Sequence, residues 1–189
     1  MTMIQEECHG VSRRHSHSKQ DNYCHGRFMM STIVVVEKEG FATIAADSLT
    51  TWGSAKESAE YILNHQKILR IGESYLAISG PTSAKLAIKD YFANKPDADL
   101  TSVDTIFRTW LKLHAALKDH YFLNPNEDRN DAFESTRIDA LIANAHGIFG
   151  VEAHRVVQQF SRYYAYGTGW QHALAGCGKT SISQSRSIY

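Results

Sequence analysis

The sequence has 189 residues, of which 43% are hydrophobic, so the chain is long and apolar enough to bury the core of one domain. Its 20 Lys and Arg residues balance its 20 Asp and Glu residues, and this balance gives no sign of a nucleic-acid or anionic-membrane partner. No run approaches the roughly 18 apolar residues of a membrane helix, and the polar N-terminus lacks the apolar core of a signal peptide.

Residues 1–30 show neither helical nor strand periodicity, and we interpret them as a disordered leader, a propeptide or an overextended start. They contain Cys8, Cys24 and several histidines, but the spacing fits no standard zinc site, so no metal is predicted. The third cysteine, Cys177, is far away in the sequence. Widely spaced cysteines are typical of a reduced compartment, and we expect a cytoplasmic protein.

From Ser31 onward the pattern becomes that of antiparallel strands. Ile33–Val36 is a β-branched run, Glu39-Gly40 is a turn signal, and Phe41–Asp47 is a second strand. Lys67–Ile71 and Tyr75–Ser79 repeat this arrangement, so two hairpins are predicted.

Two helices are predicted next, at about Thr82–Phe92 and Val103–Phe122, with Thr101–Asp104 resembling a capping box at the start of the second. Leu123–Thr136 is rich in Asn, Asp and Glu and is expected to be an exposed loop. Further strands are expected at Ile138–Ala143, Ile148–Glu152 and Tyr163–Tyr166. Strands, helices and strands in this order predict an α+β fold in which helices pack outside a sandwich of sheets.

Ser31 is the residue whose position indicates chemistry. Met30-Ser31 is a start-like dipeptide: if translation begins at Met30, removal of this methionine leaves a free α-amine on the serine. An α-amine has a pKa of about 7.7–8.0, so it can accept the proton of the hydroxyl on its own residue. One residue then provides both nucleophile and general base.

Residues 31–48, which include an aspartate sixteen positions after Ser31, resemble the opening of the proteasome β-subunit/HslV family of N-terminal-nucleophile peptidases. The segment AADSLTTWG looks particularly like the betaproteobacterial proteasome homologues, and weaker likeness extends to about residue 172. The resemblance implies a four-layer αββα sandwich over residues 31–174 and a threonine-type protease mechanism. It also implies stacked homo-oligomeric rings that take unfolded polypeptide, and it makes an ATPase unfoldase a conceivable partner.

Four further residues match the family's site. The resemblance implies that Asp47 holds the site together and that Lys67 lowers the pKa of the α-amine, because a nearby cation disfavours a second positive charge. It implies that Gly80 directs a backbone N–H at the oxyanion and that Thr168 replaces a serine that bonds near the α-amine. Without the resemblance, Asp47 would be a turn cap, Lys67 a solvated strand-edge lysine, and Gly80 a strand-to-helix turn.

The sequence departs from the family pattern in three ways. Ser31 stands where threonine is usual, and because serine lacks the methyl group that stiffens χ1, we expect slower turnover. Met29-Met30 precedes it in place of a propeptide glycine. Residues 175–189 are an atypical polar tail, and we expect that the C-terminal part is truncated or frame-shifted after about residue 174. Gly176–Thr180 imitates a phosphate-binding loop but lacks its first glycine, and no cofactor is predicted.

The leading hypothesis is therefore a self-compartmentalising endopeptidase that uses Ser31 to hydrolyse peptide bonds of unfolded proteins. Two alternatives stay open. The first is a catalytically inactive ring subunit, which retention of the leader would favour. The second is an N-terminal-nucleophile amidase that acts on a small amide.

Overall fold

The computed structural model describes residues 31–52, 55–95, 97–125 and 131–185. The predictions for residues 1–30 lie outside this part of the chain. The strands are β1 (Thr32–Lys38), β2 (Phe41–Ala46), β3 (Thr50–Trp52), β4 (Ala55–Glu57), β5 (Ile68–Ile71), β6 (Ser74–Ser79), β7 (Asp139–Asn144), β8 (Gly147–Val151), β9 (Val157–Phe160) and β10 (Tyr163–Gly167). The helices are α1 (Thr82–Ala93), α2 (Val103–Asp119) and α3 (Trp170–Ser185). The fold is thus α+β, as predicted.

Among the residues that the structure describes, every strand pairing is antiparallel. Strands β10, β1 and β2 form a three-stranded sheet, strands β5 to β9 form a five-stranded sheet in chain order, and β3 pairs with β4 alone. Both predicted hairpins, β1–β2 and β5–β6, are confirmed.

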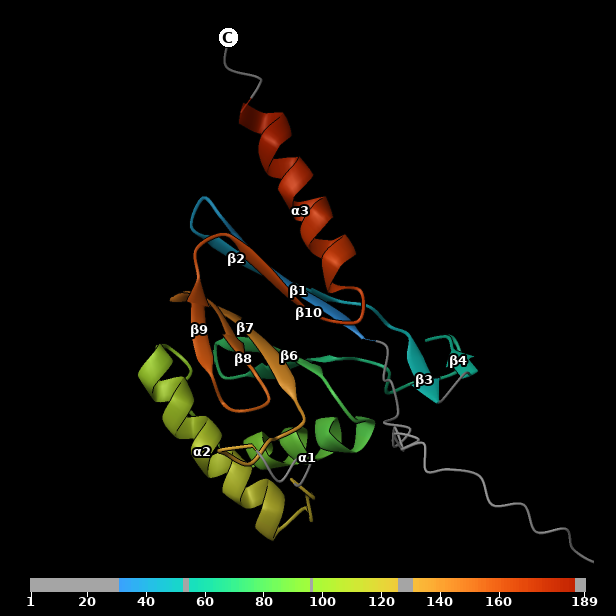
Figure 1. The fold of residues 1–189 in the computed structure, drawn as a ribbon, viewed down its shortest axis with the longest axis vertical. Coiled ribbons are helices and arrows are strands. Elements are labelled where there is room, and N and C mark those ends of the chain that lie inside the picture. The colour runs from blue at the N-terminus through green and yellow to red at the C-terminus, as the bar shows by residue number, and fades with distance from the viewer. Residues whose placement is uncertain (1–30, 53–54, 96, 126–130, 186–189) are drawn as a thin grey trace, which may run out of the picture.

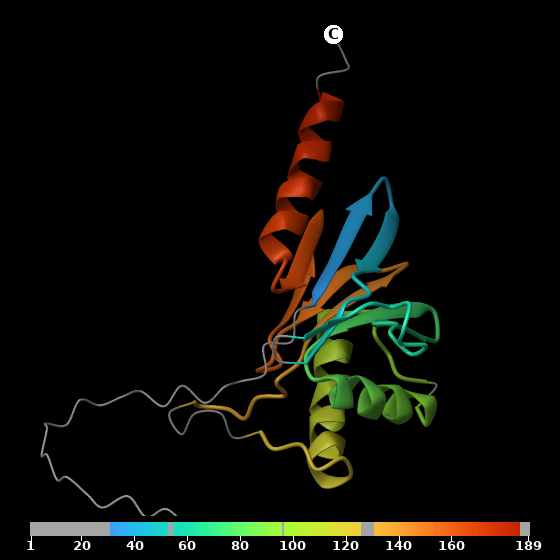
Figure 2. The same cartoon turned by 90° about the vertical axis from the view of Figure 1, so that its right-hand side faces the viewer.

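The five-stranded sheet is covered on both faces. Leu76 and Ile78 of β6 pack with Trp110 and the other apolar residues of α1 and α2, while Ala77, between them in the sequence, packs with Ile33 of β1. Side chains on a strand alternate between faces, so the consecutive apolar residues Leu76–Ile78 of β6 and Ala140–Ala143 of β7 are all buried. Figures 1 and 2 show α1 and α2 on one side of this sheet and the three-stranded sheet on the other.

Helix α2 carries the predicted apolar stripe, but its ends differ from the prediction. Its N-cap is Ser102, whose hydroxyl accepts the backbone N–H of Thr105, and the Thr105 hydroxyl completes the capping box by accepting the N–H of Ser102. Thr101 bonds instead to Asp99, with Oγ1–Oδ1 at 2.7 Å. The prediction of a Thr101–Asp104 box was therefore one residue early. The helix ends at Asp119 and not at Phe122, which has a φ of 55° that no α-helix accommodates.

Helix α3 was not predicted, since most of it lies in residues 175–189, which were interpreted as a polar tail. It contacts β10 and β1, and it extends beyond these strands at the top of Figure 1. None of its side chains described at 170–178 is fully buried. In the described part of the chain, no helix combines the length and the apolar content needed to cross a membrane.

We predict that Leu113→Ala in α2 lowers the free energy of unfolding by about 2–5 kcal/mol, because Leu113 is 1% exposed and the substitution leaves a cavity in the core. Leu111→Ala on the same helix is the matched control. Leu111 is 44% exposed, so its loss should change the free energy of unfolding by about 0.5 kcal/mol or less. Urea denaturation measures both values, and equal losses would contradict the assignment of the core.

Candidate active site

Ser31 lies directly before β1 and is only 4% exposed. Its backbone carbonyl is packed against Gly167 at the end of β10, the residue next to Thr168. A Cβ at position 167 would lie 1.9 Å from the carbonyl oxygen of Ser31, and Gly167 has a φ of +89°. Only glycine permits this conformation and this approach at once, so Gly167 fixes where β10 meets the start of β1.

Asp47 follows β2 and binds to the backbone beside Ser31. Its carboxylate accepts the backbone N–H of Thr32 and, at 3.0 Å, that of Leu49. Its own N–H donates to the carbonyl oxygen of Thr32 at 2.9 Å. Asp47, at the end of β2, therefore fixes the backbone of Thr32, the first residue of β1.

Lys67 lies directly before β5, and its side chain is 10% exposed. The ammonium group forms an ion pair with Asp47 and donates to the carbonyl oxygen of Leu49 at 2.8 Å. The alternative interpretation of Lys67 as a solvated lysine at a strand edge is therefore wrong, because its side chain is largely enclosed. A cation this enclosed can influence the charge state of groups next to it.

A small pocket of about 30 Å³ brings three of the five predicted residues together: Ser31, Lys67 and Gly80 line it. Gly80, with a φ of +156°, leads from β6 into α1. Asp47 reaches this pocket indirectly, through its ion pair with Lys67. Thr168 instead lines a separate cavity of about 440 Å³.

Several residues at these cavities were missed in the sequence. Lys85 of α1 lines the pocket of Ser31, and burial, followed by the nearby Lys67 and Lys89, lowers its pKa. Asp139, at the start of β7, lines the cavity of Thr168, and burial raises its pKa. Of these two residues, only Lys85 could have been found from the sequence, because it follows Gly80 by five residues on a predicted helix and so lies near the predicted site.

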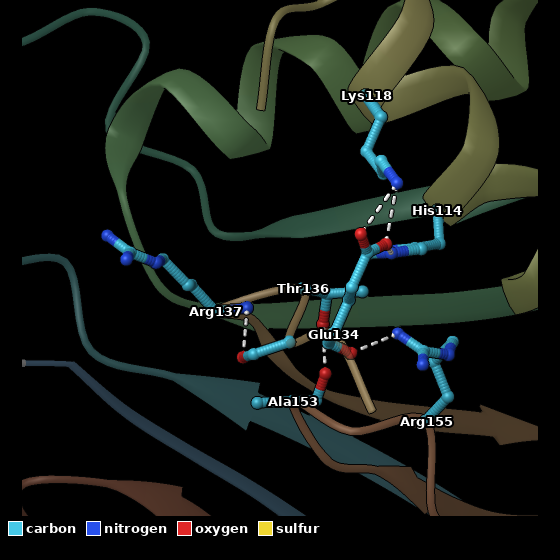
Figure 3. A network of polar contacts seen from close by, with 8 residues as sticks. His114, Lys118, Glu134, Thr136, Arg137, Ala153 and Arg155 are labelled. Carbon is cyan, nitrogen blue, oxygen red and sulfur yellow. Dashed lines mark hydrogen bonds and ion pairs between the residues drawn. The ribbon is translucent and has the colours of Figure 1, made fainter. Parts of the chain in front are cut away.

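A polar network holds the backbone that faces Gly80. Figure 3 shows Glu134 bound by Lys118 of α2, with Nζ–Oε2 at 2.6 Å, and its backbone carbonyl bound by Arg155 at 2.6 Å. Three residues further on, the carbonyl oxygen of Arg137 lies 3.0 Å from where a Cβ on Gly80 would stand. The network therefore supports the turn that contains Gly80.

His114 also joins this network. Its Nε2 lies 3.1 Å from Oε2 of Glu134, and burial lowers its pKa in spite of that carboxylate. It is one of the buried residues of α2. Within the described ranges, no three side chains of His, Cys, Asp or Glu lie close enough together to share a metal ion.

Two solved structures of one protein illustrate what this chain is similar to over most of its length. Thiobacillus denitrificans BPH is 49% identical, with a TM-score of 0.74, and the same protein in complex with epoxomicin is 48% identical, with a TM-score of 0.72. Each match covers 83% of this chain and 80% of the other. The chain belongs to the proteasome/HslV family. The proteasome/HslV resemblance of residues 31–48 is thereby confirmed, and the fold is that of a protease-type N-terminal-nucleophile hydrolase.

Other comparisons add little to this family assignment. HslV from Trypanosoma brucei is 18% identical with a TM-score of 0.49, over 76% of this chain and 75% of that one, which is too weak to support an argument. No protein-family model matches the sequence. No curated protein matches it either.

We predict that Gly167→Ala is much more destabilising than Gly40→Ala. Both glycines have a positive φ, which costs an alanine about 1–2 kcal/mol, but a Cβ on Gly40 meets open space. At position 167 the new Cβ must push β10 away from Ser31. Urea denaturation measures the loss, and hydrogen exchange at the β1 amides should accelerate only in Gly167→Ala. Similar behaviour of the two variants would contradict the contact with Ser31.

Proposed function

We propose that the protein is an endopeptidase of the proteasome type in which Ser31 is the nucleophile. The observation that carries this proposal is that Ser31 and Lys67 line one pocket, with Asp47 joining Lys67 to the backbone of Thr32. The relative that binds epoxomicin, at 48% identity, supports a protease-type site.

The proposed chemistry begins with removal of residues 1–30, which frees the α-amine of Ser31. The amine takes the proton of the Ser31 hydroxyl, Oγ attacks the peptide carbonyl carbon, and the carbon–nitrogen bond of the peptide breaks. The amine returns its proton to the leaving nitrogen. Water then hydrolyses the Ser31 ester by the same proton transfers in reverse.

The other site residues have supporting roles in this proposal. Lys67 keeps the α-amine neutral by disfavouring a second positive charge, and Asp47 holds both Lys67 and the start of β1. The backbone N–H of Gly80 stabilises the oxyanion, since glycine allows a close backbone approach. Thr168 bonds near the α-amine, although in the structure it lines the neighbouring cavity.

We further propose the assembly that the family implies. The packing of α1 and α2 on the five-stranded sheet, of this sheet on the three-stranded one, and of α3 on β10 and β1 supports a four-layer αββα sandwich. Rings of such subunits would enclose the sites of Ser31 and admit unfolded polypeptide in the cytoplasm, with or without an ATPase unfoldase.

We predict that the native protein, made from the whole coding sequence, cleaves a reduced and carboxymethylated protein substrate, and that Ser31→Ala lowers the rate by about a thousandfold or more. Ser31→Thr should retain activity and turn over about two to five times faster, because threonine has a stiffer χ1. Ser161→Ala, an exposed serine between β9 and β10, is the control and should match the wild type.

The same assay separates the alternatives. Hydrolysis of small amides without cleavage of unfolded protein would favour the amidase. A ring-sized particle without any hydrolysis, measured by native mass spectrometry, would favour an inactive ring subunit. Cleavage that survives in Ser31→Ala would contradict the nucleophile.

A further inference from the structure

The pocket beside Ser31 contains two lysines whose charges are balanced differently. Lys67 forms its ion pair with Asp47, so its positive charge is largely neutralised. Lys85 comes from the first turns of α1 and lines the same pocket. Its Nζ donates to the backbone carbonyl oxygen of Asn64 at 2.7 Å, which is a neutral acceptor.

Lys85 keeps an unneutralised charge in this position. Among residues 31–52, 55–95, 97–125 and 131–185, none provides a carboxylate partner for it. Its side chain is half-buried, and Lys67 and Lys89 add to the positive potential around it. One bond to Asn64 uses one of the three N–H groups of the ammonium, so two remain for a guest.

The rest of the pocket favours an anion of small size. A volume of about 30 Å³ has room for a group the size of a carboxylate and none for an aromatic ring. The pocket also borders the N-terminal end of α1, where Pro81 gives no side-chain cap and the helix dipole is positive. An apolar guest would bury the Lys85 charge without a partner, which costs free energy.

The position of the pocket identifies the part of a substrate that would enter it. Ser31 and Gly80 both line it, and in the proposed function these are the nucleophile and the oxyanion donor. A side chain that fills the pocket therefore belongs to the residue whose carbonyl carbon is attacked. The charge of the pocket then acts on the amino acid that precedes the cleaved bond.

We propose that Lys85 is a specificity-determining residue that selects substrates with Asp or Glu immediately before the cleaved bond. This inference rests on the proposed function of Ser31. The substrate carboxylate would accept hydrogen bonds from Lys85 and supply the negative charge that the pocket lacks. Lys67 would contribute less to this selection, because its charge is already paired with Asp47.

The test compares peptide substrates that differ only in Glu against Gln before the cleaved bond. The native wild-type protein should show kcat/KM about tenfold higher for Glu, as expected for a charged hydrogen bond. Lys85→Arg should keep the preference, Lys85→Met should bring the ratio to about one, and Lys85→Glu should reverse it. Lys112→Met, an exposed lysine on α2 that does not line the pocket, is the control and should behave as the wild type.

A binding measurement separates failure of this inference from failure of the proposed function. Acetylated peptides ending in Glu or Gln carboxamide are titrated into full-length Ser31→Ala protein, with and without Lys85→Met, by calorimetry. Binding of the Glu peptide that depends on Lys85, without hydrolysis by the wild type, would support the inference and overturn the nucleophile. Hydrolysis with equal rates for Glu and Gln would overturn the inference and leave the nucleophile standing. If the protein shows no preference for the Glu peptide and no hydrolysis, both the inference and the nucleophile are overturned.

Discussion

The ion pair between Asp47 and Lys67 joins the two sheets at the end where Ser31 precedes β1. Asp47 follows β2 of the three-stranded sheet, and Lys67 precedes β5 of the five-stranded sheet. Removing two charges from water is costly, and this cost is offset because the carboxylate also accepts two backbone N–H groups and the ammonium also donates to Leu49. The position of Ser31 relative to its pocket depends on this set of bonds.

The same bonds connect the fold to the proposed chemistry. An N-terminal nucleophile needs an amine that stays neutral and a backbone that does not move during attack. In the proposed chemistry Lys67 keeps the amine neutral and Lys85 gives the adjoining pocket its charge. Asp47 bonds to the backbone of Thr32, and Gly167 packs against the backbone carbonyl of Ser31. These residues come from separate parts of the chain, so the site exists only in the assembled fold.

Much of the fold follows from local sequence signals. The β-branched run of β1 with its Glu39-Gly40 turn and the apolar stripe of α2 each determine their element. Strand β9 was missed because Val157–Phe160 has two glutamines at its centre, which give no strand pattern, and it forms a strand by pairing with β8. Helix α3 was missed because Gly176, Gly178 and several serines have low helix propensity. The roles of Lys67 and Lys85 depend on contacts distant in sequence, which no local pattern encodes.

The central claim, that Ser31 becomes an N-terminal nucleophile, is tested most directly by mass spectrometry of the native protein after incubation with epoxomicin, the ligand held by the BPH relative. The account predicts a chain that begins at Ser31, increased by the mass of one epoxomicin, with the modification mapped to Ser31. A chain that retains residues 1–30 and cleaves unfolded protein, or an adduct on any other residue, would contradict it.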